Sequence, residues 1–214
     1  MPLMELIDGK LGASAPLRNE PVQARSTARL TALLDAAAAA IDELGYERLT
    51  TAMVAERAGA SIGTVYRYFP DRIAVLQALA TRNLDYVVRG IERAIGDRRA
   101  TTWREAVLGS FDVYVGAFRS QRGFASLRGG DVLDLRPASD GATANSHIAD
   151  IMMNGIAARF GTEASPRARF AFENAVEVQD ALIARAFARS AKGDPAFLES
   201  GRALVLSILS ERLA

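Results

Sequence analysis

The sequence predicts an all-α protein. Apolar residues recur at steps of three and four residues over the segments 22–44 and 72–95, which is the spacing of one face of a helix. Residues suited to cap a helix stand before several such segments, and glycine often follows them. Half of the 214 residues are apolar and 24% are charged, as in ordinary globular proteins, and this length allows one domain or two small ones.

Composition excludes several classes of site. The sequence has no cysteine, so disulfides, thiol nucleophiles and thiolate metal sites are excluded. Its one histidine, His147, has no second histidine with which to bind a metal. No apolar run approaches the ~18 residues of a membrane span, and no signal peptide is evident. We therefore expect a cytoplasmic protein with neither a metal nor another cofactor.

The N-terminal residues 1–20 include prolines and glycines and show little periodicity, which predicts a mobile tail. A helix is predicted from Val22 to Leu44, where Gly45 ends the pattern. Arg25 and Arg29 lie one turn apart near its start. Its predicted buried stripe consists of Ala28, Leu30, Leu33, Leu34, Ala37, Ala38, Ile41 and Leu44.

The segment 50–69, TTAMVAERAGASIGTVYRYF, predicts two short helices around a turn. The first helix covers 51–58, and Gly59 stands where it would end, since glycine adopts the left-handed conformation at the lowest cost. Ser61 is suited to cap the second helix, 62–68. Small side chains at Ala55 and Ala58 permit a close crossing of the two helices. Such an arrangement is a helix-turn-helix.

We expect the second helix to bury Ile62 and Val65 and to leave its other face for a partner. Gly63 permits close approach of a backbone, and Thr64 can bond a base or a phosphate. Further groups suited to phosphates and base edges are those of Tyr66, Arg67 and Tyr68. The alternative is that the aromatic residues belong to the core, which we expect for Phe69 and one of the two tyrosines. The second helix is therefore a candidate DNA-reading element.

The run AERAGASIGTVYRYFPDR, residues 55–72, resembles the signature of TetR-family transcriptional repressors. The resemblance covers about residues 22–82. A basic residue often stands in this family where this chain has Ile62, so one phosphate or base contact is expected to be missing. The positions shared with the signature are Ala58, Gly59, Ser61, Gly63, Thr64, Tyr66, Tyr68, Phe69 and Arg72.

The resemblance implies a three-helix DNA-binding domain at 21–82, with its helix-turn-helix at 50–69, and a helical ligand-binding and dimerisation domain at 83–214. It implies a transcriptional regulator that binds a palindromic operator as a homodimer and is released by a small-molecule effector. Repression is the usual outcome in the family. The residues expected at the DNA are Arg25, Arg29, Thr51, Ser61, Ile62, Gly63, Thr64, Tyr66, Arg67, Tyr68 and Arg72.

Charge alone gives weak support for a DNA partner. The formal net charge is +1, and the arginines and acidic residues between positions 18 and 72 balance. DNA binding therefore requires that basic side chains gather on one face and acidic ones on others. The basic residues expected on that face are Arg25, Arg29, Arg67 and Arg72.

The segment after the motif predicts a larger helical body. Pro70 and Asp71 start a helix over 72–95, and a capping box at 102–105 opens another over 103–119. A short piece at 124–127, a loop at 129–137 and a helix at about 140–160 that ends at Gly161 follow. By the resemblance, the body holds an effector pocket, and the alternative is that its large side chains form ordinary core. The candidates are Trp103, Phe111, Tyr114, Phe118, Met152, Phe172 and Glu177.

Two further helices are predicted to follow the Ser-Pro and Asp-Pro pairs at 165–166 and 194–195. In the family, the corresponding C-terminal helices pair with those of a second copy. The alternative is that their apolar stripe is buried within one chain. The candidate interface residues are Ala175, Gln179, Leu182, Ala186, Leu204, Val205 and Ile208.

Two other functions remain open at this stage. An enzyme would need a nucleophile, a metal cluster or a phosphate loop, and the sequence has no glycine-rich phosphate loop, no histidine pair and no serine elbow. The second alternative is a ligand-binding or adaptor module whose helix-turn-helix no longer reads DNA. The balanced charge of residues 18–72 and the apolar Ile62 keep that alternative open.

Overall fold

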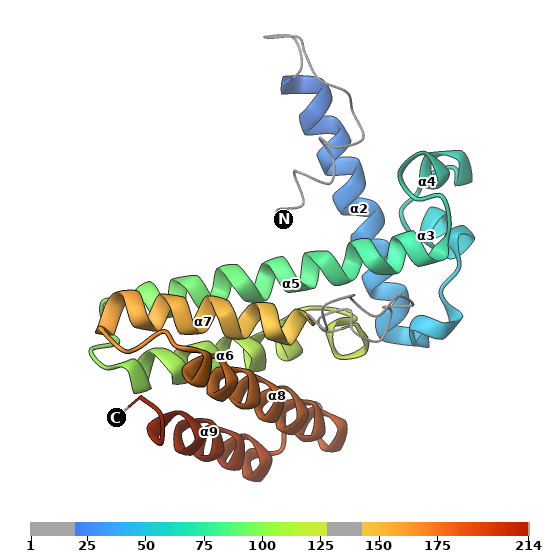
Figure 1. Cartoon of the computed structure of the whole chain (residues 1–214). Helices are drawn as coiled ribbons and strands as arrows, with labels where there is room; N and C mark the ends of the chain where they lie inside the picture. Colours follow the sequence, from blue (N-terminus) through green and yellow to red (C-terminus); the bar gives the residue numbers. More distant parts are fainter. Residues whose placement is uncertain (1–19, 128–142, 214) are drawn as a thin grey trace. The chain divides into compact units, whose positions relative to one another are not determined.

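The computed structural model describes residues 20–127 and 143–213, and the regular structure in that part of the chain is entirely helical (Figure 1). The predicted all-α class is therefore confirmed. The predicted mobile tail and the predicted loop at 129–137 lie outside the described residues. None of the described helices is long and apolar enough to cross a membrane.

Contacts divide the chain into two compact units. Of the described residues, the first unit, here called the head unit, comprises 20–85 and 122–127, and the second, the body unit, comprises 86–121 and 143–213. Helix α5 (Arg72–Gly96) contributes residues to both. The predicted division after residue 82 stays a prediction.

The head unit contains α2 (Glu20–Leu44), α3 (Thr51–Arg57), α4 (Ile62–Tyr68) and the first part of α5. Two single turns of 3₁₀ helix, η1 (Tyr46–Arg48) and η2 (Phe124–Ser126), complete it. Most of the predicted stripe of α2 is buried in this unit's core, together with Leu49, Val54, Val65, Leu76 and Leu79. Ala28 and Leu44 are exposed, because the predicted stripe runs past the part of α2 that the core covers.

Residues 122–127 belong to the head unit although they follow α6 in the chain. The Gly123 N–H donates to a carboxylate oxygen of Asp42 on α2, over 3.2 Å. The buried amide of Asn83 on α5 donates to the carbonyl of Leu127, over 3.0 Å. Leu127 is fully buried in the core of the head unit. This short segment is therefore held by both long helices of the unit.

The body unit contains the rest of α5 with α6 (Trp103–Ser120), α7 (Ala144–Phe160), α8 (Pro166–Arg189) and α9 (Pro195–Ser210). Helix α8 packs against α9 along one side and against α7 along another. The predicted capping box is present, since Thr102 caps Glu105 N–H and the Glu105 carboxylate caps Thr102 N–H. Ser165 and Asp194 cap α8 and α9 as predicted.

Helix α7 begins later than the sequence pattern predicts. The pattern places its start at about residue 140, whereas Thr143 has extended backbone and its hydroxyl oxygen accepts from Ser146 N–H. Thr143 is therefore the N-cap of α7. The predicted end at Gly161 is confirmed.

Candidate nucleic-acid interface

The turn between α3 and α4 has the hydrogen bonds of a Schellman motif. The Ala60 N–H donates to the Ala55 carbonyl over 2.9 Å, and the Gly59 N–H donates to the Glu56 carbonyl over 3.1 Å. Gly59 has φ of 59°, a conformation that costs glycine least. The chain then turns at once into α4, where the Ser61 hydroxyl oxygen accepts from Thr64 N–H over 3.1 Å. Local sequence thus fixes the helix-turn-helix.

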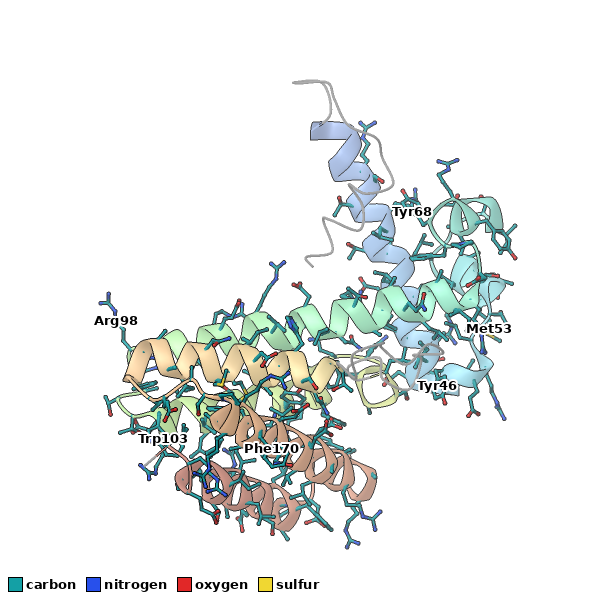
Figure 2. All side chains as sticks on the ribbon, viewed as in Figure 1. Tyr46, Met53, Tyr68, Arg98, Trp103 and Phe170 are labelled. Carbon is teal, nitrogen blue, oxygen red and sulfur yellow. The ribbon has the colours of Figure 1, made fainter. Side chains whose placement is uncertain are left out.

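The inner side of α4 is anchored in the head unit. Val65 is fully buried and Phe69, just after the helix, is nearly so. Tyr68 is half-buried and faces α2, where its hydroxyl lies 3.2 Å from the Ser26 hydroxyl (Figure 2). Phe69 and one tyrosine are therefore packed inward, as the core alternative expected.

The outer side of α4 is exposed. Ile62 is 44% exposed and Tyr66 is 53% exposed, and Gly63 and Arg67 are exposed as well. The expectation that Ile62 is buried is wrong. In a helix of seven residues, Val65 and Phe69 define the inner side, and Ile62 lies one turn before Tyr66 at the edge of the outer side.

Gly63 has no structural role that the described residues explain. Its φ lies outside the left-handed region. A Cβ built on Gly63 would meet only the Ser61 hydroxyl oxygen, at 3.8 Å, which is an ordinary contact. Alanine would therefore fit at this position and would favour the helix. The smallness of Gly63 leaves room for something outside the chain.

Four hydroxyl-bearing candidates are engaged with their neighbours. The Thr51 hydroxyl on α3 donates to the Tyr66 hydroxyl over 3.4 Å, which links the start of α3 to the outer face of α4. The Ser61 and Thr64 hydroxyls lie 2.9 Å apart. Each of these hydroxyls keeps a lone pair or a proton for a further partner.

The charged residues of the head unit separate into paired and unpaired groups. Arg57 forms a salt bridge with Glu43 at 2.6 Å, and Arg82 forms one with Asp35 at 2.6 Å. The Arg57 guanidinium lowers the pKa of the Glu43 carboxyl, chiefly through their hydrogen bond. By contrast, the exposed arginines at positions 25, 29 and 67 form no ion pair with a residue that the structure describes.

Arg72 differs from those three arginines. It is half-buried at the start of α5, and its guanidinium donates to the Glu47 carbonyl over 2.6 Å. The expected phosphate contact of Arg72 therefore competes with a structural bond between α5 and η1.

Comparisons with known proteins agree with this geometry. The family described as bacterial regulatory proteins, tetR family, matches residues 33–79. The family described as tetracyclin repressor-like, C-terminal domain, matches residues 101–213, which is more than half of the chain. This chain belongs to the TetR family.

Individual proteins of this family are also similar to this chain. A TetR-family transcriptional regulator from Streptomyces coelicolor, whose crystal structure is known, is 30% identical, covers 86% of this chain and 99% of its own, and superimposes with a TM-score of 0.73. The HTH-type transcriptional repressor KstR of Mycolicibacterium smegmatis is 37% identical over 62 residues, which is 29% of this chain and 30% of that protein. The HTH-type transcriptional regulator BetI of Serratia proteamaculans is 31% identical over 84 residues, 37% of this chain and 42% of that protein. This chain thus spans less than half the length of these two curated relatives.

The effector candidates in this TetR-family body unit are mostly core residues. Phe118 is half-buried and stacks on Phe187 with ring centroids 4.9 Å apart, and Glu177 is exposed to solvent. An open depression of about 550 Å³ lies elsewhere among the described residues of the body unit. None of the candidates lines it. The buried candidates are Trp103, Phe111, Tyr114, Met152 and Phe172.

That depression lies between α5 and α7. Arg159 lines the depression and donates to the carbonyls of Ile95 and Ala100, the latter over 2.5 Å. These bonds satisfy one backbone carbonyl in the last turn of α5 and one just after the helix. Sequence periodicity could not indicate this site, because it depends on how two helices lie beside each other. Its lining residues are Glu92, Ile95, Gly96, Ile151, Asn154, Gly155, Ala158 and Arg159.

The predicted dimer interface stays a prediction. Four of its candidate residues are buried within the single chain, because the inner stripes of α8 and α9 face the rest of the body unit. Of the other three, Leu204 is 47% exposed, and Leu182 and Ile208 are half-buried. The four buried residues are Ala175, Gln179, Ala186 and Val205.

Among the described residues, no group of histidine, aspartate and glutamate side chains is arranged to hold a metal ion. His147 is exposed on α7.

Proposed function

We propose that this protein is a sequence-specific DNA-binding transcriptional regulator that reads the major groove with the outer face of α4. The observation that carries the proposal is Gly63, a helical glycine that lies on an exposed face and has no internal reason to be glycine. A recognition helix in the major groove needs close approach of its first turn to the base edges. Gly63 supplies that room between Ile62 and the Ser61–Thr64 pair.

The unpaired arginines support the same partner. Arg67 lies on α4 itself, and Arg25 and Arg29 lie one turn apart near the start of α2. Phosphate contacts by arginine contribute affinity and set the register of a protein on the duplex. The salt bridges of Arg57 and Arg82 neutralise acidic groups of the head unit, which reduces their repulsion of DNA.

We propose further that the protein acts as a homodimer on a near-palindromic operator. Two recognition helices of a dimer enter successive major grooves about 34–36 Å apart. The exposed side chains of Leu204 on α9 and Phe170 on α8, which is 68% exposed, support a surface for a second copy on these helices (Figure 2). Membership of the TetR family supports the same assembly.

Regulation by a small-molecule effector completes the proposal. An effector that binds the body unit better in the DNA-free state lowers operator affinity by the same factor by which DNA lowers effector affinity. Repression is proposed because the relatives that share the helix-turn-helix include repressors by name. We propose a cytoplasmic location as well, because a regulator of this kind acts on DNA.

Selection from a library of random DNA duplexes tests the function. Purified protein is incubated with the library at moderate salt, and the bound duplexes are sequenced. We expect enrichment of one near-palindromic motif whose affinity falls steeply with added salt. Enrichment must also be sought after unfolding and refolding, which removes any bound effector. If folded and dimeric protein enriches no motif in either case, the adaptor alternative replaces the proposal.

A further inference from the structure

Ile62 is an exposed branched side chain in a head unit that buries most of its large apolar residues. Only 0–8% of the surface of Leu30, Leu33, Leu34 and Ile41 is exposed, whereas 44% of that of Ile62 is exposed. Ile62 is absent from the core cluster of the head unit and from the half-buried residues packed against it. Ile62 is therefore not held by the core and is open to a partner outside the chain.

The position of Ile62 places it on the outer face of α4. Ile62 and Tyr66 are one helical turn apart, so their side chains lie next to each other on the same face. The Tyr66 hydroxyl accepts from the Thr51 hydroxyl over 3.4 Å, which limits where its ring can lie. Beside them, Gly63 leaves open space. The surface formed by Ile62, Gly63 and Tyr66 therefore combines polar and apolar groups. Ile62 is its one large side chain without a polar atom.

The chemistry of Ile62 limits what it can recognise on DNA. Its side chain has neither a donor nor an acceptor, so it makes no hydrogen bond to a phosphate or to a polar base edge. The major groove presents one apolar group, the C5-methyl group of thymine, and apolar side chains contact it. An exposed isoleucine on a groove-facing surface therefore distinguishes thymine from the other three bases.

We infer that Ile62 reads a thymine methyl group in each half of the operator. This inference rests on the proposed function, because it assumes that α4 enters the major groove. It assigns to Ile62 a role in base specificity and none in phosphate contact. Recognition of that base pair then depends on the thymine methyl group and little on the charges around the base pair.

Uracil substitution tests the inference with the full-length protein. In the duplex recovered by selection, each thymine is replaced in turn by uracil, which removes the methyl group and keeps the base pair. We expect one symmetrical thymine position at which replacement weakens binding by wild-type protein about fourfold per half-site, or roughly fifteenfold in both halves. The same replacement should leave the affinity of Ile62→Ala unchanged, as a double-mutant cycle requires.

Two variants serve as controls. Ile62→Val keeps an apolar branched side chain and should keep the preference for thymine over uracil. Leu44→Ala truncates another exposed apolar residue of the head unit, 37% exposed, and should also keep it. Circular dichroism of all three variants should show unchanged helix content, since both side chains are exposed.

The outcomes separate the two claims. If uracil weakens binding nowhere, or weakens Ile62→Ala as much as wild type, the inference about Ile62 is overturned while the DNA-binding function stands. A selected motif without thymine also overturns it. If wild-type protein selects no motif, the proposed function itself fails, and the inference fails with it.

Discussion

The hydroxyl of Tyr68 at the end of α4 lies 3.2 Å from the hydroxyl of Ser26 on α2. This contact joins residues 42 positions apart and fixes the inner side of the recognition helix against the longest helix of the head unit. It makes Tyr68 a positioning residue for α4. Tyr66, by contrast, directs its ring outward.

Replacing Tyr68 by Phe should therefore act through the fold. The change removes the hydroxyl contact and keeps the ring, so we expect a loss of about 1 kcal/mol in the free energy of unfolding. Operator affinity should fall only to the extent that α4 is held less firmly against α2. Chemical denaturation and binding to the selected duplex measure the two effects. A large loss of affinity at unchanged stability would show instead that the Tyr68 hydroxyl contacts DNA.

Arg67→Ala should weaken operator binding with little effect on stability or dimerisation. Arg67 is exposed on α4 and forms no ion pair with the described residues, so its removal costs the fold little. Loss of one phosphate contact from each half of the proposed dimer should reduce the slope of log affinity against log salt by about 1.8. Binding isotherms at several salt concentrations measure that slope.

Arg57→Ala is the matched control for Arg67→Ala. It removes the same charge from the head unit, but the Arg57 guanidinium is already bound to Glu43. We expect a smaller change in both affinity and slope. Equal effects of the two substitutions would mean that only the net charge of the head unit matters for binding. Arg67 on α4 would then make no direct contact with DNA.

The helix-turn-helix could be predicted from the sequence because its determinants are local. The cap at Ser61, the glycine turn at Gly59 and the buried Val65 lie within seven residues, and each acts on its immediate neighbours. The exposure of Ile62 could not be predicted in the same way. In so short a helix, spacing does not determine which edge of the apolar side faces the core.

The features that the sequence did not predict depend on contacts between residues far apart in the chain. The bond between Asp42 and Gly123 joins residues 81 positions apart, and no local pattern indicates that 122–127 belongs with the head unit. Likewise, the apolar stripes of α8 and α9 predict burial, and Gln179 and Val205 are buried within the chain. Spacing alone does not indicate which positions of these helices stay exposed, as Leu204 does.

The capping box of α6 should make stability depend on pH. Hydrogen bonds from Thr101 and Thr102 lower the pKa of the Glu105 carboxyl below its ordinary value of 4.5. Because the folded pKa is the lower one, the ionised carboxylate stabilises the fold above pH 4.5 and loses that effect as the pH falls through the folded pKa. Glu105→Gln should therefore lower the melting temperature at pH 7. The difference from wild type should shrink in acid, and a difference that persists at low pH would contradict this account.

Gln179 offers a test of the body unit. Its amide nitrogen is buried and has no hydrogen-bond partner among the described residues, which is costly for the fold. Gln179→Met replaces the amide by an apolar group of similar length. We expect the free energy of unfolding to stay equal or to rise by up to about 1 kcal/mol. A clear loss of stability in thermal unfolding would show that the amide has a partner in solution.

The most direct test of the central claim is the substitution Gly63→Ala, measured for stability and for DNA binding on the same preparation. Alanine fits the space at Gly63 and favours a helix, so we predict that stability rises by about 0.5–1 kcal/mol while affinity for the selected duplex falls at least tenfold. Gly116→Ala in α6, where a Cβ meets nothing within 4 Å, is the control and should stabilise the protein without weakening DNA binding. If Gly63→Ala binds the operator as tightly as wild type, the first turn of α4 does not approach DNA closely, and the proposed reading face is wrong.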